Sequence, residues 1–241
     1  MRVLVWSSVA AVVAALAGAS AFAAEPSPAP GDYITEGGWG RLTVSAPKNG
    51  RHAFSLFAMG ANAHMCDADG EIVGRRATLE TYEGEPACVI DFEPTGDGIA
   101  IQASESCRSF CGARAWFAGE YLATASGCDD AARAKTRETF KRHYDRKEYD
   151  RAYALLSPLP ARCAKTLHWL ERGEVLNDIA ITQYKRGDRA GCLRTLEPLA
   201  KDAATPDDQI EIDGWLAERE AYQPILDAAR FNLRLCRKPA R

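Results

Sequence analysis

The sequence predicts an α+β protein, in which a small antiparallel β-barrel or β-sandwich is followed by an all-α domain of helical hairpins. Three observations predict this class. Short β-prone runs separated by glycine-containing turns fill the chain as far as about Cys128. The remainder is rich in Ala, Leu, Arg and Glu at helical spacing, and it contains an internal repeat. We therefore expect one domain boundary, at about residues 126–130.

Residues 1–23 have the pattern of a cleavable signal peptide. Arg2 precedes an apolar run from Val3 to Ala17, and the small residues Ala21 and Ala23 fit a cleavage site after Ala23, with Ala21 as the alternative. The run is shorter than the ~20 residues that a membrane-spanning helix needs. Because the cysteine of a lipoprotein signal is lacking, we expect a soluble periplasmic product without a membrane anchor after cleavage.

A Pro-rich linker is expected at 24–32, and the β-domain at 33–127. The expected strands cover 42–44, 54–56, 72–73, 88–92 and 99–101, with a last one at 116–117 leading to 121–122. Turns are expected at 48–50, 82–86 and 95–98, where Gly, Asn, Asp or Pro supplies the turn conformation. The stretch Asp67-Ala-Asp-Gly70 is also expected to be a turn, because it lacks the later ligands of a calcium loop.

The segment 128–241 is expected to be all helix. Asp129 and Asp130 can cap a first helix, and Asp188 can cap a later one. Thr205-Pro-Asp-Asp208 has the pattern of a helix start, and a final helix is expected from Pro224 to Cys236.

A repeat with an offset of forty residues occurs in this half. Its first copy consists of Tyr144, Arg146, Glu148, Ala152, Leu156, Pro158 and Leu159, and its second of Tyr184, Arg186, Asp188, Cys192, Leu196, Pro198 and Leu199. Such a repeat predicts stacked helical hairpins. The turn at 184–190 resembles that between the two helices of a tetratricopeptide repeat (TPR), so we expect a TPR-like domain.

The even number of cysteines in an exported chain predicts disulfides. They are Cys66, Cys88, Cys107, Cys111, Cys128, Cys163, Cys192 and Cys236. We expect each half to pair its own four, and although four cysteines allow three pairings, the preferred ones are 66 with 88, 107 with 111, 163 with 192, and 128 with 236. A zinc site is the alternative, but no second closely spaced pair accompanies Cys107 and Cys111.

The sequence shows no catalytic, cofactor-binding or metal-binding motif. His168 and Glu171 lie one helical turn apart and could be two metal ligands, but a pair on the helix surface is the preferred interpretation. No nucleophile elbow and no phosphate-binding glycine loop is present. We therefore expect a non-catalytic protein without cofactors, and a cell-wall-modifying enzyme is an alternative.

Charge differs between the two halves. Residues 24–128 contain fourteen acidic and seven basic residues, a net charge of −7, whereas residues 129–241 have a net charge of +3. An acidic β-domain repels nucleic acid and attracts a cationic protein partner. The candidate partner-binding residues are Glu80, Tyr82, Glu83, Glu85, Asp91 and Glu93.

Three stretches carry a resemblance to a known family. Residues 61–66, 88–92 and above all the run Cys107-x3-Cys-Gly-Ala ending in Phe117-x-Gly-x-Tyr121 resemble a small β-domain of bacterial envelope proteins, associated with LprI-type lysozyme inhibitors. The resemblance covers about residues 33–122. It implies a periplasmic β-domain that binds and inhibits lysozyme-like cell-wall hydrolases. The alternative is an envelope adaptor that binds its protein partner through the TPR-like domain.

Overall fold

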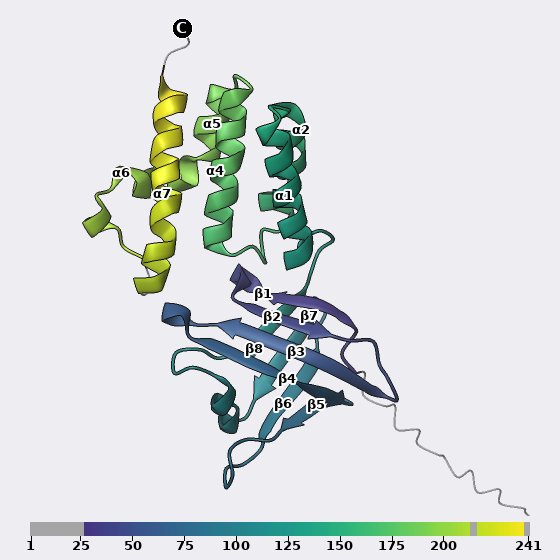
Figure 1. Cartoon of the computed structure of the whole chain (residues 1–241). Coiled ribbons are helices and arrows are strands. Elements are labelled where there is room, and N and C mark those ends of the chain that lie inside the picture. Colours follow the sequence, from purple (N-terminus) through teal and green to yellow (C-terminus); the bar gives the residue numbers. More distant parts are fainter. Residues whose placement is uncertain (1–26, 213–215, 239–241) are drawn as a thin grey trace, which may run out of the picture.

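The first half of the chain folds into a closed antiparallel β-barrel, and the second half into helices that stand on one end of it (Figure 1). This computed structural model describes residues 27–212 and 216–238. The expected α+β class is confirmed, with a barrel rather than a sandwich. The expected signal peptide lies outside the described residues.

Eight strands form the barrel within the described ranges. They are β1 (Gly31–Thr35), β2 (Gly40–Val44), β3 (Arg51–Met59), β4 (Met65–Val73), β5 (Arg76–Leu79), β6 (Cys88–Pro94), β7 (Gly98–Ala103) and β8 (Gly119–Ala123). Each strand pairs with the next, and β8 pairs back with β1, so that Tyr33 lies opposite Ala123. Strand β1 begins inside the expected linker, so Gly31 and Asp32 belong to the barrel.

The barrel interior is filled with side chains, as expected for eight strands. Along β3, inward positions alternate with outward ones, because successive side chains of a strand point to opposite faces. The rings of Phe54 and Phe92 pack edge to face with centroids 5.1 Å apart. Other fully buried residues of this core are Leu42, Leu56, Ile72, Ile90, Ile99 and Tyr121.

The turn expected at Asp67-Ala-Asp-Gly70 is wrong, because this stretch lies inside β4. Ala68 is buried on the inner face, and Gly70 pairs with Phe54 of β3. A Cβ atom on Gly70 would lie 2.6 Å from Leu79 and 3.3 Å from Phe54. The glycine therefore makes room for two large neighbours, and these small inward residues concealed the alternating pattern of a strand.

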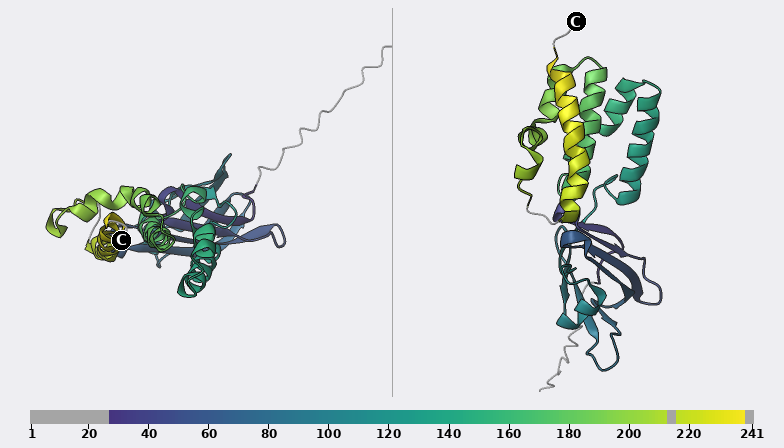
Figure 2. Two further views of the ribbon diagram at one scale, coloured as in Figure 1. Left: turned by 90° about the horizontal axis from the view of Figure 1, so that it is seen from above. Right: turned by 60° about the vertical axis from the view of Figure 1, so that its left-hand side comes forward.

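Helices follow the barrel from Asp130 onward. They are α1 (Asp130–Asp145), α2 (Tyr149–Leu156), α3 (Leu159–Arg162), α4 (Trp169–Lys185), α5 (Arg189–Thr195), α6 (Glu197–Ala204) and α7 (Leu216–Arg237). Short 3-10 turns are η1 (Glu36–Gly38), η2 (Ala61–Ala63), η3 (Glu105–Phe110) and η4 (Asp207–Gln209). Helices α1, α4 and α7 stand side by side above the barrel (Figure 2). In the described part of the chain, no helix has the length and apolar character needed to cross a membrane.

Two of the expected helix caps are confirmed. The Asp129 side chain accepts a hydrogen bond from the Ala132 amide at 2.8 Å, and Asp188 accepts one from the Gly191 amide at 2.7 Å. The start expected at Thr205-Pro-Asp-Asp208 leads only into the short 3-10 turn of residues Asp207–Gln209. Thr205 does not cap it, because its hydroxyl donates to the Lys201 carbonyl and closes α6. Helix α7 begins before Pro224, which lies within it.

The forty-residue repeat occupies equivalent places in two hairpins, α1–α2 and α4–α5. Tyr144 and Tyr184 lie near the ends of the first helices, and Leu156 and Leu196 are fully buried after the turns. The Arg186 Nε atom donates to Asp150 at 2.7 Å and connects the two hairpins. The repeat in the sequence therefore corresponds to a repeat in the packing.

The cysteines pair within each half, as expected, but every preferred pairing is wrong. The disulfides are Cys66–Cys111, Cys88–Cys107, Cys128–Cys163 and Cys192–Cys236. Cys107 lies within turn η3 and Cys111 directly follows it, and they join this turn to two different strands, β6 and β4. In the helical half, α4 lies between Cys163 and Cys192 in the chain. Cys163 bonds instead to Cys128 before α1, and Cys192 bonds to Cys236 on α7.

Candidate functional site

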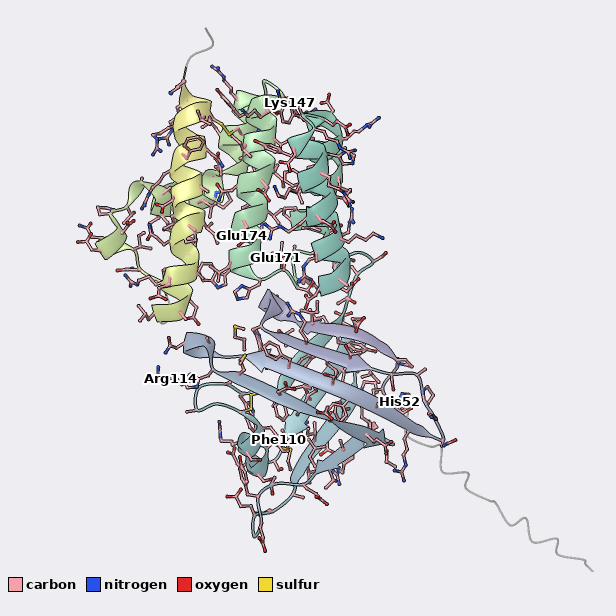
Figure 3. All side chains as sticks on the ribbon, viewed as in Figure 1. His52, Phe110, Arg114, Lys147, Glu171 and Glu174 are labelled. Atoms are coloured by element: carbon pink, nitrogen blue, oxygen red, sulfur yellow. A yellow bond between two sulfur atoms is a disulfide. The ribbon has the colours of Figure 1, made fainter. Side chains whose placement is uncertain are left out.

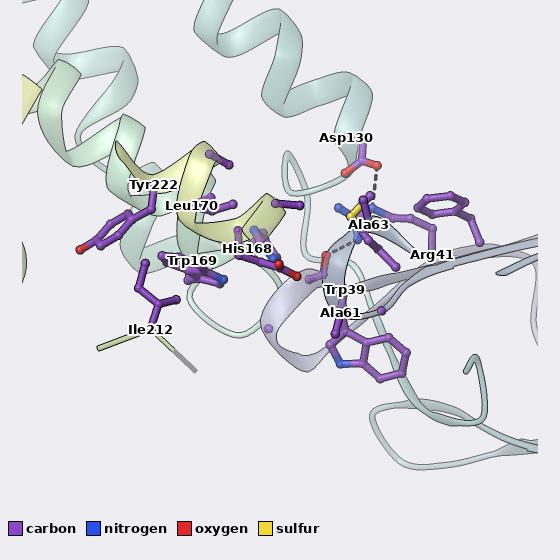
Figure 4. A pocket seen from close by; sticks show the side chains of 18 of the residues that line it. Trp39, Arg41, Ala61, Ala63, Asp130, His168, Trp169, Leu170, Ile212 and Tyr222 are labelled. Atoms are coloured by element: carbon purple, nitrogen blue, oxygen red, sulfur yellow. Dashed lines mark hydrogen bonds and ion pairs between the residues drawn. The ribbon is translucent and has the colours of Figure 1, made fainter. Parts of the chain in front are cut away.

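A cleft of about 1020 Å³ lies between the end of the barrel and the helical domain (Figure 4). Both domains supply its walls, and the lining is mainly aromatic and aliphatic. Ligand sites of roughly 300–1,000 Å³ are commonly found at domain interfaces, with apolar walls and a few polar groups. The cleft is therefore the candidate functional site.

The two domains touch on either side of the cleft, which holds its walls in place. The Gly37 amide of η1 donates to the Lys165 carbonyl at 2.8 Å. At η2, the Asn62 amide donates to the Glu218 carboxylate at 3.1 Å, and the Ala217 amide donates to the Asn62 side chain at 3.4 Å. Asn62 therefore satisfies an amide at the start of α7, which fixes this helix to the β3–β4 turn.

The barrel wall is formed by two turns and the strands between them. Trp39 follows η1, and the Met59 amide donates to its carbonyl at 2.8 Å, which places the end of β3 beside it. Phe57 points outward from β3 into the cleft, and 47% of Met59 is exposed. The wall is thus apolar and includes a flexible methionine side chain.

The helical wall is formed by the first turns of α4 and α7 with the segment before α7. Trp169 packs edge to face against Tyr222, with ring centroids 4.9 Å apart, and it is 40% exposed. The Tyr222 hydroxyl donates to Asp202 at 2.9 Å, and burial together with this bond raises the pKa of Tyr222, so the phenol stays neutral. Leu170 and Ile212 complete this apolar surface.

At the end near α1, the cleft is closed by a cluster of ion pairs. The Arg41 Nε atom lies 2.6 Å from Asp130, and the buried Arg133 contacts both Asp130 and Glu171. Burial by itself would raise the pKa of Asp130, but the two arginines outweigh it and hold this pKa below its usual value. Glu171 lies on α4 next to Glu174, which pairs with Arg137 of α1 (Figure 3).

His168 lies in the cleft at the N-terminal end of α4. Burial lowers the pKa of His168, and the nearby Arg41 lowers it further against the opposing effect of Glu171 and Glu218. The imidazole is therefore neutral at neutral pH. The pair considered from the sequence is divided in the structure, because Glu171 binds Arg133 while His168 lines the cleft. No group of three metal-ligating side chains occurs among the described residues.

The candidate partner-binding residues lie on the barrel away from the helices (Figure 1), and they do not line the cleft. Glu80, Tyr82, Glu83 and Glu85 lie in the connection between β5 and β6, where Tyr82 is 71% exposed. Asp91 is on β6 and accepts two hydrogen bonds from Arg76, at 2.6 and 3.1 Å. Glu93 is exposed on the same strand. Four of the six candidate partner-binding residues therefore lie in one exposed loop.

Sequence reasoning missed the aromatic residues of the cleft. Trp39, Trp169 and Tyr222 come from three distant parts of the chain. The sequence around each of them does not differ from that around an aromatic residue of the hydrophobic core. Among the residues of the cleft, His168 is the one that the sequence offers as a possible ligand-binding side chain. A glycine-rich turn beside a tryptophan, Gly37-Gly-Trp39, is the one local signal, since glycines often allow close approach between segments.

Comparisons with known proteins do not assign this chain to a family. No family model, no curated protein and no solved structure matches it. The resemblance to an LprI-associated β-domain remains an expectation.

Proposed function

We propose that this protein is a non-catalytic binding protein of the periplasm, which captures a segment of a protein partner in the cleft between its two domains. The cleft itself carries the proposal, because Met59, Trp169 and other apolar side chains of both domains face it and remain partly exposed. Aromatic and methionine side chains are typical of protein-binding surfaces. The charged groups at the end of the cleft near α1 are held in ion pairs, such as Arg41 with Asp130, which suits binding better than proton transfer.

The disulfides support the proposed compartment. All eight cysteines are paired, and such a number of disulfides is typical of proteins exported to an oxidising compartment. Removal of the signal peptide at residues 1–23 and a periplasmic location are parts of the proposal.

The helical hairpins support the adaptor form of this function. In a TPR-like arrangement, stacked hairpins present a surface to a partner segment, and the first turns of α4 and α7 are the parts that reach the cleft here. The barrel then supplies the opposite wall. Under this proposal neither domain binds the partner alone.

A second candidate function is the inhibition of lysozyme-like cell-wall hydrolases, and the loop between β5 and β6 favours it. Tyr82 protrudes there among Glu80, Glu83 and Glu85, all exposed. An exposed aromatic residue surrounded by acids complements the cationic surface of a basic hydrolase.

Affinity capture from a periplasmic extract tests both candidates. The baits are the mature chain 24–241, a Trp169→Ala variant, and a variant with Tyr82→Ala, Glu83→Gln and Glu85→Gln. If the cleft is the site, the loop variant retains the partner and Trp169→Ala loses it. The reverse pattern, with binding of a purified basic lysozyme at low salt, supports inhibition through the loop. Equal capture by all three baits contradicts the proposed site. Circular dichroism checks that each variant is folded.

A further inference from the structure

We infer that the interdomain cleft recognises a short peptide segment that carries both basic and apolar side chains. The inference rests on the proposed function and specifies the chemistry of the partner segment. It follows from the charges and the exposed apolar groups of the cleft walls.

Exposed apolar side chains face each other across the cleft. Met59 of the barrel is 47% exposed and Trp169 of the helical domain is 40% exposed, while Phe57 and Ile212 are partly covered. An apolar ligand side chain between these walls would remove surface of both domains from water. The unbranched Met59 can adapt to ligand side chains of different shape.

The charged end of the cleft near α1 contributes little net charge. Arg41 and Arg133 carry two positive charges, and Asp130 and Glu171 carry two negative charges within the same cluster. His168 is neutral because its pKa is lowered. This end therefore neither attracts nor repels a charged ligand strongly.

The opposite side of the cleft is acidic. Its charged lining residues are Asp202, Glu211 and Glu218. The first turns of α4 and α7 lie on this side of the cleft, and their positive helix ends amount to about +1 elementary charge together. Glu218 is bound by the Asn62 amide, so Asp202 and Glu211 are the carboxylates considered for a ligand. Their two negative charges exceed the charge of the helix ends, and the cleft keeps an excess of negative charge beside Trp169.

An acidic wall beside aromatic rings is a suitable environment for a Lys or Arg side chain. The cation would approach the exposed ring of Trp169, which packs on the buried Tyr222, and pair with Asp202 or Glu211. An acidic segment would be repelled by the same carboxylates. Charge thus selects a basic segment, and the apolar walls select hydrophobic neighbours of the basic residue.

Two labelled peptides test the inference. In one fluorescein-labelled peptide Lys and Phe alternate, and in the other Glu replaces each Lys. Fluorescence anisotropy with the mature chain should show that the Lys peptide binds at least about 10-fold more tightly at low salt, with a smaller difference at high salt. Equal affinity for both peptides, or no binding of either, would overturn the inference.

Matched variants locate the binding. Trp169→Ala and Glu211→Lys should each weaken binding of the Lys peptide by about 10-fold. Phe231→Ala removes an aromatic residue that is 51% exposed on α7 outside the cleft lining, and Glu85→Lys makes the same charge change on the β5–β6 loop. Both controls should bind as the wild type does. If Glu85→Lys weakens binding as much as Glu211→Lys, net charge explains the binding and the cleft assignment is wrong.

The outcomes separate this inference from the proposed function. A natural partner captured through Trp169, together with no preference for the Lys peptide, leaves the proposed function standing and refutes the inferred ligand chemistry. Glu211 is exposed, so the Glu211→Lys variant should fold and keeps the test decisive even if Trp169→Ala is unstable.

Discussion

Lys147 occupies a backbone conformation that favours glycine, with a φ of 62°. It follows α1 at the end of the molecule far from the barrel (Figure 3). In the second copy of the repeat the equivalent residue is Gly187, with a φ of 84°. The two turns therefore have the same conformation, but only one has the residue that adopts it without steric cost.

We predict that Lys147→Gly stabilises the protein. Relief of the left-handed strain should raise the free energy of unfolding by up to about 1 kcal/mol, because part of the gain is lost to the greater freedom of glycine in the unfolded chain. Urea unfolding measures the change. Gly187→Lys is the control and should be destabilising; a loss of stability in Lys147→Gly would contradict the prediction.

Two neighbouring glycines of η1 should respond differently to alanine. Gly37 and Gly38 both have a positive φ, of 76° and 74°. A Cβ on Gly38 would lie 2.7 Å from backbone atoms of Thr166 and His168, whereas one on Gly37 meets only the Trp39 ring at 3.9 Å. We expect Gly38→Ala to cost about 2–4 kcal/mol of stability and Gly37→Ala about 1–2 kcal/mol. Equal losses in urea unfolding would show that the domain contact is not tight.

His168 should make stability depend on pH near neutrality. Its pKa is lowered in the folded protein from an ordinary value of 6.5, so the unfolded chain takes up a proton first as the pH falls. Stability is therefore greatest above this value and decreases as the pH falls through 6.5 towards the folded pKa. His168→Gln should flatten the dependence, measured as the free energy of unfolding from neutral to mildly acidic pH. An unchanged profile would refute the assignment.

At the scale of elements, disulfides join segments that the sequence order does not pair. Cys128–Cys163 holds the linker before α1 to the segment after α3, which also contacts η1 through the Lys165 carbonyl. This disulfide therefore supports the domain junction as well as the helical domain.

We predict different effects from removing two disulfides of similar loop length. Cys128–Cys163 and Cys192–Cys236 span 35 and 44 residues, so replacing either pair by serines should cost about 3–4 kcal/mol. Only the first replacement should also weaken binding of the Lys peptide, because it loosens a wall of the cleft. Urea unfolding and fluorescence anisotropy distinguish the two effects. If both variants bind the Lys peptide equally well, the Cys128–Cys163 disulfide does not stabilise the contact between the two domains.

Several elements could be predicted from the sequence because short-range interactions define them. Asp129 and Asp188 cap their helices through amides three residues away, and the repeat is visible as a periodic pattern. Strand β4 could not be predicted, because Gly70 at an inward position is needed to leave room for Phe54 and Leu79 of the neighbouring strands β3 and β5. The residues of this strand are thus chosen to fit side chains of other strands, and the sequence around them does not show the alternating pattern of a strand.

At the scale of the whole molecule, the cleft depends on how the two domains are docked. Strand β8 ends at Ala123 and α1 begins at Asp130, so a short connection joins them. Contacts at η1, η2 and the Arg41–Asp130 ion pair fix the docking from three sides. The candidate site is thus a property of both domains together.

We predict that Arg41→Ala loosens the docking without unfolding either domain. The Gly37 and Asn62 amides, which donate across the junction, should exchange hydrogen faster, while the amides of the barrel strands keep their protection. Arg51→Ala removes a barrel ion pair with Glu71 that lies outside the cleft, and it should leave these two amides unchanged. Hydrogen exchange measured by NMR would show the difference. No change in Arg41→Ala would mean that this pair is not part of the docking.

The sequence by itself determined the α+β class, two of the three candidate helix caps, the repeated hairpins and the confinement of disulfides to each half. These features depend on hydrogen bonds and periodicities that span a few residues. Only the tertiary structure decided which cysteines pair, that the β-domain closes into a barrel, and that Trp39, Trp169 and Tyr222 line one cleft. Such contacts join residues far apart in the chain, and they exist only after the barrel has closed and the helices have docked on its end.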